Sequence, residues 1–125
     1  MEKQMIDEIA RGYAVANLWT AGIDSMSGEY QPDEEKVAAL MPYAREAAQA
    51  FVHIVQPYVI HTSGLEGSRI GACLHFEREG HGTGFQDEGH GWELDRFQQV
   101  AQMMGEDAQM QDQLMDRFPS EAFAG

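Results

Sequence analysis

The chain is short of basic residues and cysteine, and it has no long apolar run. Of its 125 residues, eight are basic and 21 are acidic, and Cys73 is the single cysteine. One cysteine permits no intrachain disulfide, so a reducing compartment such as the cytosol is expected. No window approaches the roughly 18 consecutive apolar residues of a membrane span. The start, Met1-Glu2-Lys3-Gln4, lacks the basic and apolar regions of a secretory signal. We therefore expect a cytoplasmic protein without a membrane span.

The charge balance restricts the kinds of partner. With a formal net charge of −13, the chain is repelled by phosphate backbones and by anionic lipid, which argues against direct binding to nucleic acid or membranes. Its electrostatic partners would be basic proteins or cations. The alternative interpretation is that the acidity serves only solubility, because net charge bears on association and not on fold.

Most of the chain has helical spacing of its apolar residues. The segments that show it are 3–20, 32–56, 92–104 and 106–118. Pro42 is expected to divide the second segment into a short and a longer helix. Residues 22–32 are rich in turn formers and predict a loop. We expect one domain over residues 1–125, with residues 119–125 forming a frayed tail.

Residues 70–88 show a different period, typical of strands. Apolar and other residues alternate in the run Ile70-Gly71-Ala72-Cys73-Leu74-His75-Phe76-Glu77. Glu79-Gly80 can form a two-residue turn in which Gly80 supplies the positive φ. The fold class predicted is therefore α+β, with three to five helices packed around one antiparallel β-hairpin at about residues 70–88.

The same segment resembles a motif from a family of small proteins of bacteriophages and bacterial mobile elements. The residues that carry the resemblance are Arg78, Gly80, His81, Gly82, Gly84, Phe85 and Asp87, in the pattern Arg-x-Gly-His-Gly-x-Gly-Phe-x-Asp. The chain departs from the family in having Gln86 in place of an aromatic residue and Glu88 in place of a basic one. The resemblance implies no activity and no functional residues. It implies a context, that of an accessory protein expressed inside a bacterium.

Three histidines are the candidate metal ligands. His75, His81 and His90 occur near acidic residues, and such side chains bind divalent transition metals. In the predicted hairpin, however, His75 and His81 fall on opposite faces, and no ligand pair has the spacing of a zinc site. Solvent-facing or backbone-bonded histidines are therefore favoured, and no cofactor is predicted.

Nothing in the sequence has the pattern of a catalytic centre. Cys73 stands between two small residues on the predicted strand, where a free cysteine is more often a buried small hydrophobe than a nucleophile. The serines have no nucleophile elbow around them. The glycine run lies in a hairpin among acidic residues, which would repel a phosphate. No catalytic residue is predicted, and an enzyme is the class with least support.

Acidic residues gather in two segments that could contact a partner. These residues are Asp24, Glu29, Asp33, Glu34 and Glu35 in the first segment, and Glu106, Asp107, Asp112 and Asp116 in the second. A solvated face is the default interpretation of such an array. The specific alternative is mimicry of a phosphate backbone, in which the acidic side chains occupy a basic groove of another protein.

Three hypotheses of function follow from these observations. The first is a non-enzymatic inhibitor from a phage or mobile element that binds a basic, nucleic-acid-processing host defence protein, of the anti-CRISPR or anti-restriction type. The second is a metal- or small-ligand-binding protein centred on the hairpin histidines and glycines. The third is a structural protein that self-associates through its C-terminal helix, forming a homodimer.

Overall fold

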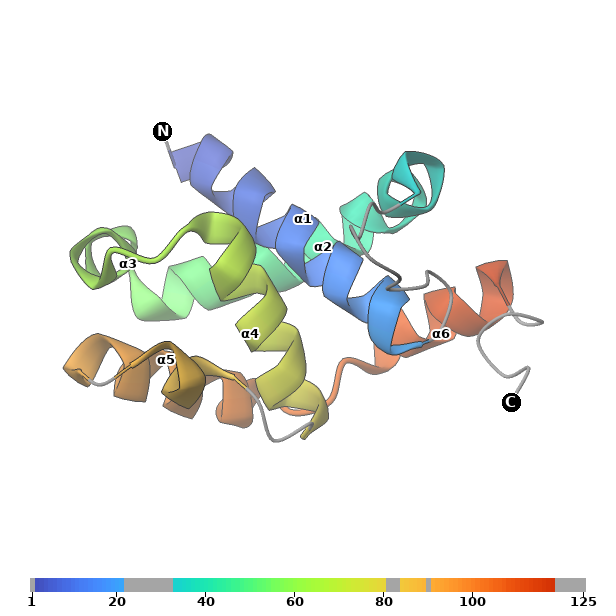
Figure 1. The fold of residues 1–125 in the computed structure, drawn as a ribbon. Coiled ribbons are helices and arrows are strands. Elements are labelled where there is room, and N and C mark those ends of the chain that lie inside the picture. Colours follow the sequence, from blue (N-terminus) through green and yellow to red (C-terminus); the bar gives the residue numbers. More distant parts are fainter. Residues whose placement is uncertain (1, 22–32, 81–83, 90, 119–125) are drawn as a thin grey trace.

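The computed structural model describes residues 2–21, 33–80, 84–89 and 91–118, and all the regular structure of these residues is helical (Figure 1). The elements are α1 (Glu2–Thr20), α2 (Glu34–Val55), α3 (Pro57–Ser63), α4 (Gly67–Glu79), the short 3₁₀ helix η1 (Phe85–Glu88), α5 (Trp92–Met104) and α6 (Ala108–Arg117). The predicted α+β fold is therefore wrong. Each described helix is too short or too polar to cross a bilayer.

The predicted hairpin at residues 70–88 is replaced by α4 and η1. The buried residues of α4 include Gly67, Ile70, Gly71 and Leu74, which are spaced i, i+3, i+4 and i+7 as on one face of a helix. His75, which the strand register put on the outer face, is also buried. Gly80 does have the positive φ predicted for it, 71°, but it ends α4 as a left-handed C-cap. Residues 81–83 of the predicted second strand lie outside the described residues.

The glycines of α4 allow it to cross α1 in direct backbone contact. A Cβ atom at Gly71 would lie 2.0 Å from the carbonyl oxygen of Ile9, and one at Gly12 would lie 2.0 Å from the carbonyl oxygen of Ser68. Glycine costs helix propensity, by roughly 0.5–1 kcal/mol relative to alanine in a helix interior. Here the absent side chain is what permits the close approach of the two helices, and this is why a glycine-punctuated segment is helical.

The second helix is continuous through Pro42, so the predicted division at this residue is wrong. Pro42 is exposed, and the buried face of α2 continues from Val37 and Leu40 to Ala44. The helix ends before Pro57, because a residue preceding proline is disfavoured in the α conformation. That residue, Gln56, has a φ of 85°, and α3 begins directly after it.

Three phenylalanines join η1 and α5 to the central helix. The ring of Phe85 stacks on that of Phe51 with centroids 6.0 Å apart, and Phe97 lies 5.3 Å from Phe85 and 5.7 Å from Phe51. All three side chains are fully buried. The core thus runs from α1 and α4 through α2 to α5.

The helices predicted at 3–20, 92–104 and 106–118 are confirmed, with α6 ending at Arg117. α6 packs against α2 and buries Met110 and Leu114. In Figure 1 it lies on the right, while α3 and the start of α5 lie on the left.

Candidate functional site

The motif residues that carry the family resemblance have structural roles where they are described. Phe85 belongs to the core, Gly80 caps α4, and the carboxylate of Asp87 accepts a hydrogen bond of 3.3 Å from the amide of Gly84. Gly84 is itself buried, and a Cβ atom there would lie 2.3 Å from the Glu77 carboxylate. His81 and Gly82 lie outside the described residues. Gly80, Gly84, Phe85 and Asp87 thus stabilise the junction of α4 and η1, while Arg78 reaches Gly105 and Asp107 ahead of α6.

The histidine hypothesis finds no metal site in the described part of the chain. His75 is 3% exposed, and its Nε2 lies 2.7 Å from the hydroxyl of Thr20 on α1. Its ring packs edge-on against Tyr13, with centroids 6.1 Å apart. Within the described ranges, no three His, Cys, Asp or Glu side chains are grouped to hold an ion. His90 lies outside those ranges, as does His81.

Cys73 is a buried thiol on α4. Its Sγ lies 3.8 Å from a carboxylate oxygen of Glu88, and its residue is 3% exposed. Burial, and then the neighbouring Glu88 charge, raise the pKa of Cys73 to about 12. A thiol that remains protonated at neutral pH is a poor nucleophile, which agrees with the packing role predicted for this cysteine.

Several acidic residues of the predicted binding surface have partners within the chain. Asp33 caps α2, since its carboxylate accepts a 3.0 Å hydrogen bond from the amide of Glu35. The guanidinium of Arg11 donates two hydrogen bonds to Glu34, of 2.6 and 2.8 Å. These bonds hold the pKa of Glu34 below its usual range. Asp107 is 8% exposed and is part of a buried network described below.

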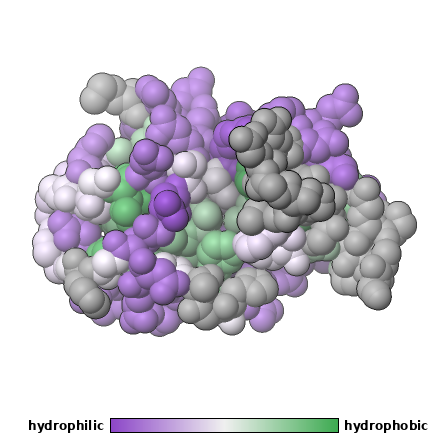
Figure 2. All heavy atoms as spheres, viewed as in Figure 1, coloured by the Kyte–Doolittle hydropathy of each residue, from purple (hydrophilic) through white to green (hydrophobic). Residues whose placement is uncertain are grey.

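The remaining described acidic residues of the predicted surface, Glu35, Glu106, Asp112 and Asp116, are exposed. Asp24 and Glu29 lie outside the described residues. Figure 2 shows that hydrophilic residues cover most of the visible face, with small hydrophobic areas between them.

The structure brings the two acidic segments together at one end of the molecule. The Nζ of Lys36, on the first turn of α2, lies 5.7 Å from the ring centroid of Phe118, directly after α6. Arg117 lies over the ring of Tyr43 on α2 at 6.0 Å. Both contacts place the last turn of α6 beside the first half of α2 (Figure 1, right). We call the described carboxylates carried by these two segments the acidic end: Asp33, Glu34, Glu35, Asp112 and Asp116. The basic side chains of Lys36 and Arg117 lie at the contact itself.

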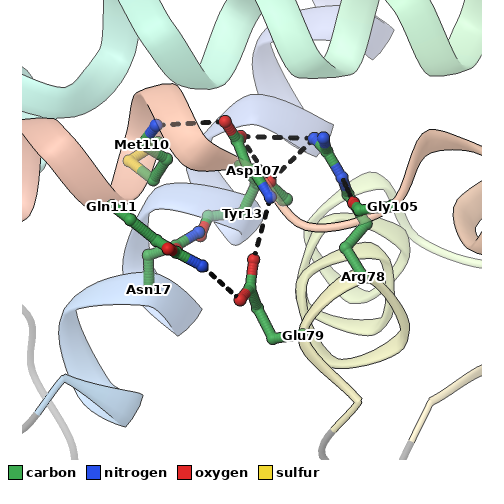
Figure 3. A network of polar contacts seen from close by, with 8 residues as sticks. All are labelled: Tyr13, Asn17, Arg78, Glu79, Gly105, Asp107, Met110 and Gln111. Atoms are coloured by element: carbon green, nitrogen blue, oxygen red, sulfur yellow. Dashed lines mark hydrogen bonds and ion pairs between the residues drawn. The ribbon is translucent and has the colours of Figure 1, made fainter.

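The beginning of α6 is held by a polar network that connects it to α1 and α4 (Figure 3). The hydroxyl of Tyr13 donates to Asp107 at 2.6 Å, and Arg78 Nη1 donates to both, at 3.0 Å and 3.2 Å respectively. Arg78 Nε donates to the carbonyl of Gly105 at 2.7 Å. The side chains of Arg78 and Asp107 are 10% and 11% exposed. This is a buried ion pair with hydrogen bonds on both partners.

Glu79 completes the network from the last turn of α4. One carboxylate oxygen accepts from the amide of Asp107 at 3.1 Å, and the other accepts from the side chain of Gln111 at 2.7 Å. The second oxygen of Asp107 accepts from the amide of Met110 at 3.0 Å, so Asp107 also caps α6. Burial, followed by the Asp107 carboxylate, raises the pKa of the Tyr13 hydroxyl. A tyrosine held neutral donates a hydrogen bond and is not a proton source.

Surface grooves border the first half of α1, and two of them are the following. One, of about 660 Å³, lies between α1 and α2; the other, of about 640 Å³, lies between α1 and the loop before α4. The first has an apolar floor at Val37 and Met41. Two of its basic side chains are paired within the groove: Arg11 with Glu34, and Arg45, whose Nε lies 3.0 Å from Asp7. Lys3, Asp7 and Glu8 also line it. The groove is therefore mixed in charge, with no concentration of one sign for a charged ligand.

Sequence analysis missed the network residues Tyr13, Arg78 and Glu79 as a group. Tyr13 and Asp107 are 94 residues apart in sequence, and no local pattern connects them. One signal was present, since an aspartate directly before a helical pattern at Ala108 is typical of an N-cap. That signal identifies Asp107 as a structural residue and removes it from the solvated surface.

The chain matches no protein-family model, no curated protein and no solved structure. The resemblance to the phage and mobile-element family therefore stays a prediction, as do the homodimer and the bacterial cytosol.

Proposed function

We propose that the protein is a non-enzymatic accessory protein of a phage or mobile element, and that its acidic end binds a basic surface of a host defence protein that processes nucleic acid. The observation that carries the proposal is the contact of Lys36 with Phe118, which unites two acidic segments distant in sequence. A target of the anti-CRISPR or anti-restriction kind has a basic groove for a phosphate backbone, and an acidic surface would compete for it.

The chemistry of the described residues favours binding over catalysis. The candidate nucleophile Cys73 is buried and protonated, and the largest cluster of ionisable side chains holds helices together. In contrast, Glu35, Asp112 and Asp116 are exposed, and no described residue forms a hydrogen bond with any of their carboxylates. Carboxylates of this kind are free to meet the basic side chains of a partner.

The proposal is tested by affinity capture with two variants of equal net charge. The acidic-end variant carries Glu35→Gln, Asp112→Asn and Asp116→Asn. The control variant carries Glu2→Gln, Glu46→Gln and Glu66→Gln, three exposed carboxylates outside the acidic end. Wild type and both variants are used to capture proteins from nuclease-treated bacterial lysate, washed at rising salt, and the recovered proteins are identified by mass spectrometry.

We expect wild type and the control variant to recover the same basic nucleic-acid-processing complex, and rising salt to release it. Three exposed charge pairs of roughly 0.2–1 kcal/mol each correspond to an affinity loss of about tenfold for the acidic-end variant. The purified complex should bind its nucleic acid more weakly in the presence of wild type. Equal recovery by the two variants, or unchanged nucleic-acid binding, would contradict the proposal.

A further inference from the structure

α6 is attached to α2 along its length and at its last turn, and its beginning is held to α1 and α4 by polar groups. Of its described residues, Met110 and Leu114 are buried. The other attachments near its start come from Asp107 and Gln111, which face α1 and the end of α4 (Figure 3). Two buried apolar side chains give only a few kcal/mol, at roughly 1.5–3 kcal/mol each. The polar network therefore has a large share in deciding where α6 lies.

Arg78 is the residue on which this network depends. Its guanidinium supplies the positive charge of the network, and it donates hydrogen bonds to Tyr13, Asp107 and the Gly105 carbonyl. Removal of one partner from a buried pair is strongly destabilising, because the other charge is left buried and uncompensated. Without Arg78, the carboxylates of Asp107 and Glu79 would face each other across the start of α6. If α6 detaches, both carboxylates become hydrated and their repulsion falls, while the core formed by α1, α2 and α4 stays closed.

We infer that Arg78 and its partners Tyr13, Glu79 and Asp107 are positioning residues for the acidic end. With the network formed, the last turn of α6 lies beside the first half of α2, so the helices that carry the two sets of carboxylates stay adjacent. With the network broken, α6 detaches from α1 and α4, and the distance between the two acidic segments increases. The inference rests on the proposed function only in its consequence for binding, since the position of α6 is measurable without any partner.

The test compares Arg78→Met with Arg69→Met. Both substitutions remove one arginine from α4 and change the net charge equally, but Arg69 is a surface residue, with a side chain 63% exposed, paired with Glu88. Amide hydrogen exchange, resolved by peptide, reports the opening of each helix. The probe for binding is a peptide of twelve arginines, titrated into the intact protein at low and physiological salt.

In Arg78→Met we expect amides of α6 to exchange at least tenfold faster, while those of α1, α2 and α4 keep their protection. We expect affinity for the arginine peptide to fall about tenfold, although the protein has become more acidic. Arg69→Met should leave both quantities near those of wild type. A gain in affinity in both variants would show that net charge alone governs binding, and would overturn the inference.

Two further variants complete the test. Arg78→Lys retains the charge but not the guanidinium fork, and should restore part of the α6 protection. Tyr13→Phe removes a single hydroxyl, so it gives a milder form of the same effect where Arg78→Met does not fold. Unchanged α6 protection in Tyr13→Phe, or equal loss in all helices, would overturn the inference. The acidic-end variant is titrated in parallel: if it binds the peptide as wild type does, the proposed function fails, whatever the Arg78 variants show.

Discussion

α4 and α6 are attached to α1 in opposite ways. α4 crosses α1 at Gly12 and Gly71, where backbone meets backbone and no side chain fits between. α6 is joined to α1 by the hydroxyl of Tyr13, which donates to Asp107 within a buried polar network. The attachment of α4 depends on close steric packing of the two backbones, and that of α6 depends on the pairing of buried polar groups.

The difference predicts which changes each region tolerates. A close backbone crossing is destroyed by any added atom but is indifferent to charge. A polar network tolerates small changes of volume but fails when one partner is lost, since the others remain buried without compensation. The α1–α4 crossing belongs to the cooperative core, whereas α6 is able to open by itself.

The largest effect is expected at the crossing. Gly71→Ala would place a Cβ atom 2.0 Å from the Ile9 carbonyl oxygen, so the helices must separate. Overpacking should lower the free energy of unfolding by about 3 kcal/mol, measured by urea denaturation. In an unobstructed helix interior the same substitution stabilises by roughly 0.5–1 kcal/mol. The sign of the change in the free energy of unfolding therefore shows whether α1 approaches Gly71 closely. The control, Ser68→Ala, changes an exposed side chain of α4 and should have little effect. A Gly71→Ala protein as stable as wild type would contradict the crossing.

An intermediate effect is expected at alkaline pH. In the folded protein the pKa of Tyr13 is raised and that of Cys73 is raised to about 12, whereas in the unfolded chain these groups ionise near pH 10 and about 8.5. Their neutral forms therefore favour the folded state fully below about pH 8.5, and this contribution is lost as the pH rises toward the folded pKa values.

The measurement is the urea midpoint at pH 7, 9 and 10.5. Wild type should lose stability over this range, and Cys73→Ala and Tyr13→Phe should each lose less. Hydrogen exchange at the higher pH distinguishes the regions: the Tyr13 contribution acts on α6, and the Cys73 contribution on α4. A stability loss in both Cys73→Ala and Tyr13→Phe as large as that of wild type would refute the assignment.

The smallest effect is expected for an ion pair outside both attachments. Arg45 and Asp7 join α2 to α1 at 3.0 Å, with side chains 46% and 40% exposed. Arg45→Gln should change the free energy of unfolding by less than about 0.5 kcal/mol, because exposed pairs gain little in water. Thermal denaturation is sufficient to measure it. A loss as large as that of Arg78→Met would mean that burial is not what distinguishes the network.

The sequence predicted the helices whose apolar residues follow a single stripe, namely α1, α5 and α6. It failed at α4, because Ile70, Ala72, Leu74 and Phe76 satisfy a period of two while Ile70 and Leu74 also satisfy a helical period. The alternation decided the prediction wrongly. Gly71 was read as a position of the alternating strand pattern, whereas in the structure it lies against the backbone of α1. Glycine shows that something approaches closely, and does not show what.

The acidic end was only partly predictable. The acidic residues of both segments stand out in the sequence, but their neighbourhood depends on how α6 packs on α2. Asp107 was grouped with the surface residues although it is buried, because its role depends on Tyr13 and Arg78, which are remote in sequence. Long-range polar pairing leaves no periodic signal, so it is visible only in the structure.

The most direct test of this account is the distance between the two acidic segments in solution. Spin labels are attached to cysteines introduced by Glu35→Cys and Met115→Cys, two exposed positions, in a Cys73→Ala background. The distribution of distances between the labels is measured by pulsed electron paramagnetic resonance. We predict one narrow distribution, which broadens and lengthens when Arg78→Met is added and is unaffected by Arg69→Met. A broad distribution in the protein that retains Arg78 would contradict the claim that the network assembles the acidic end.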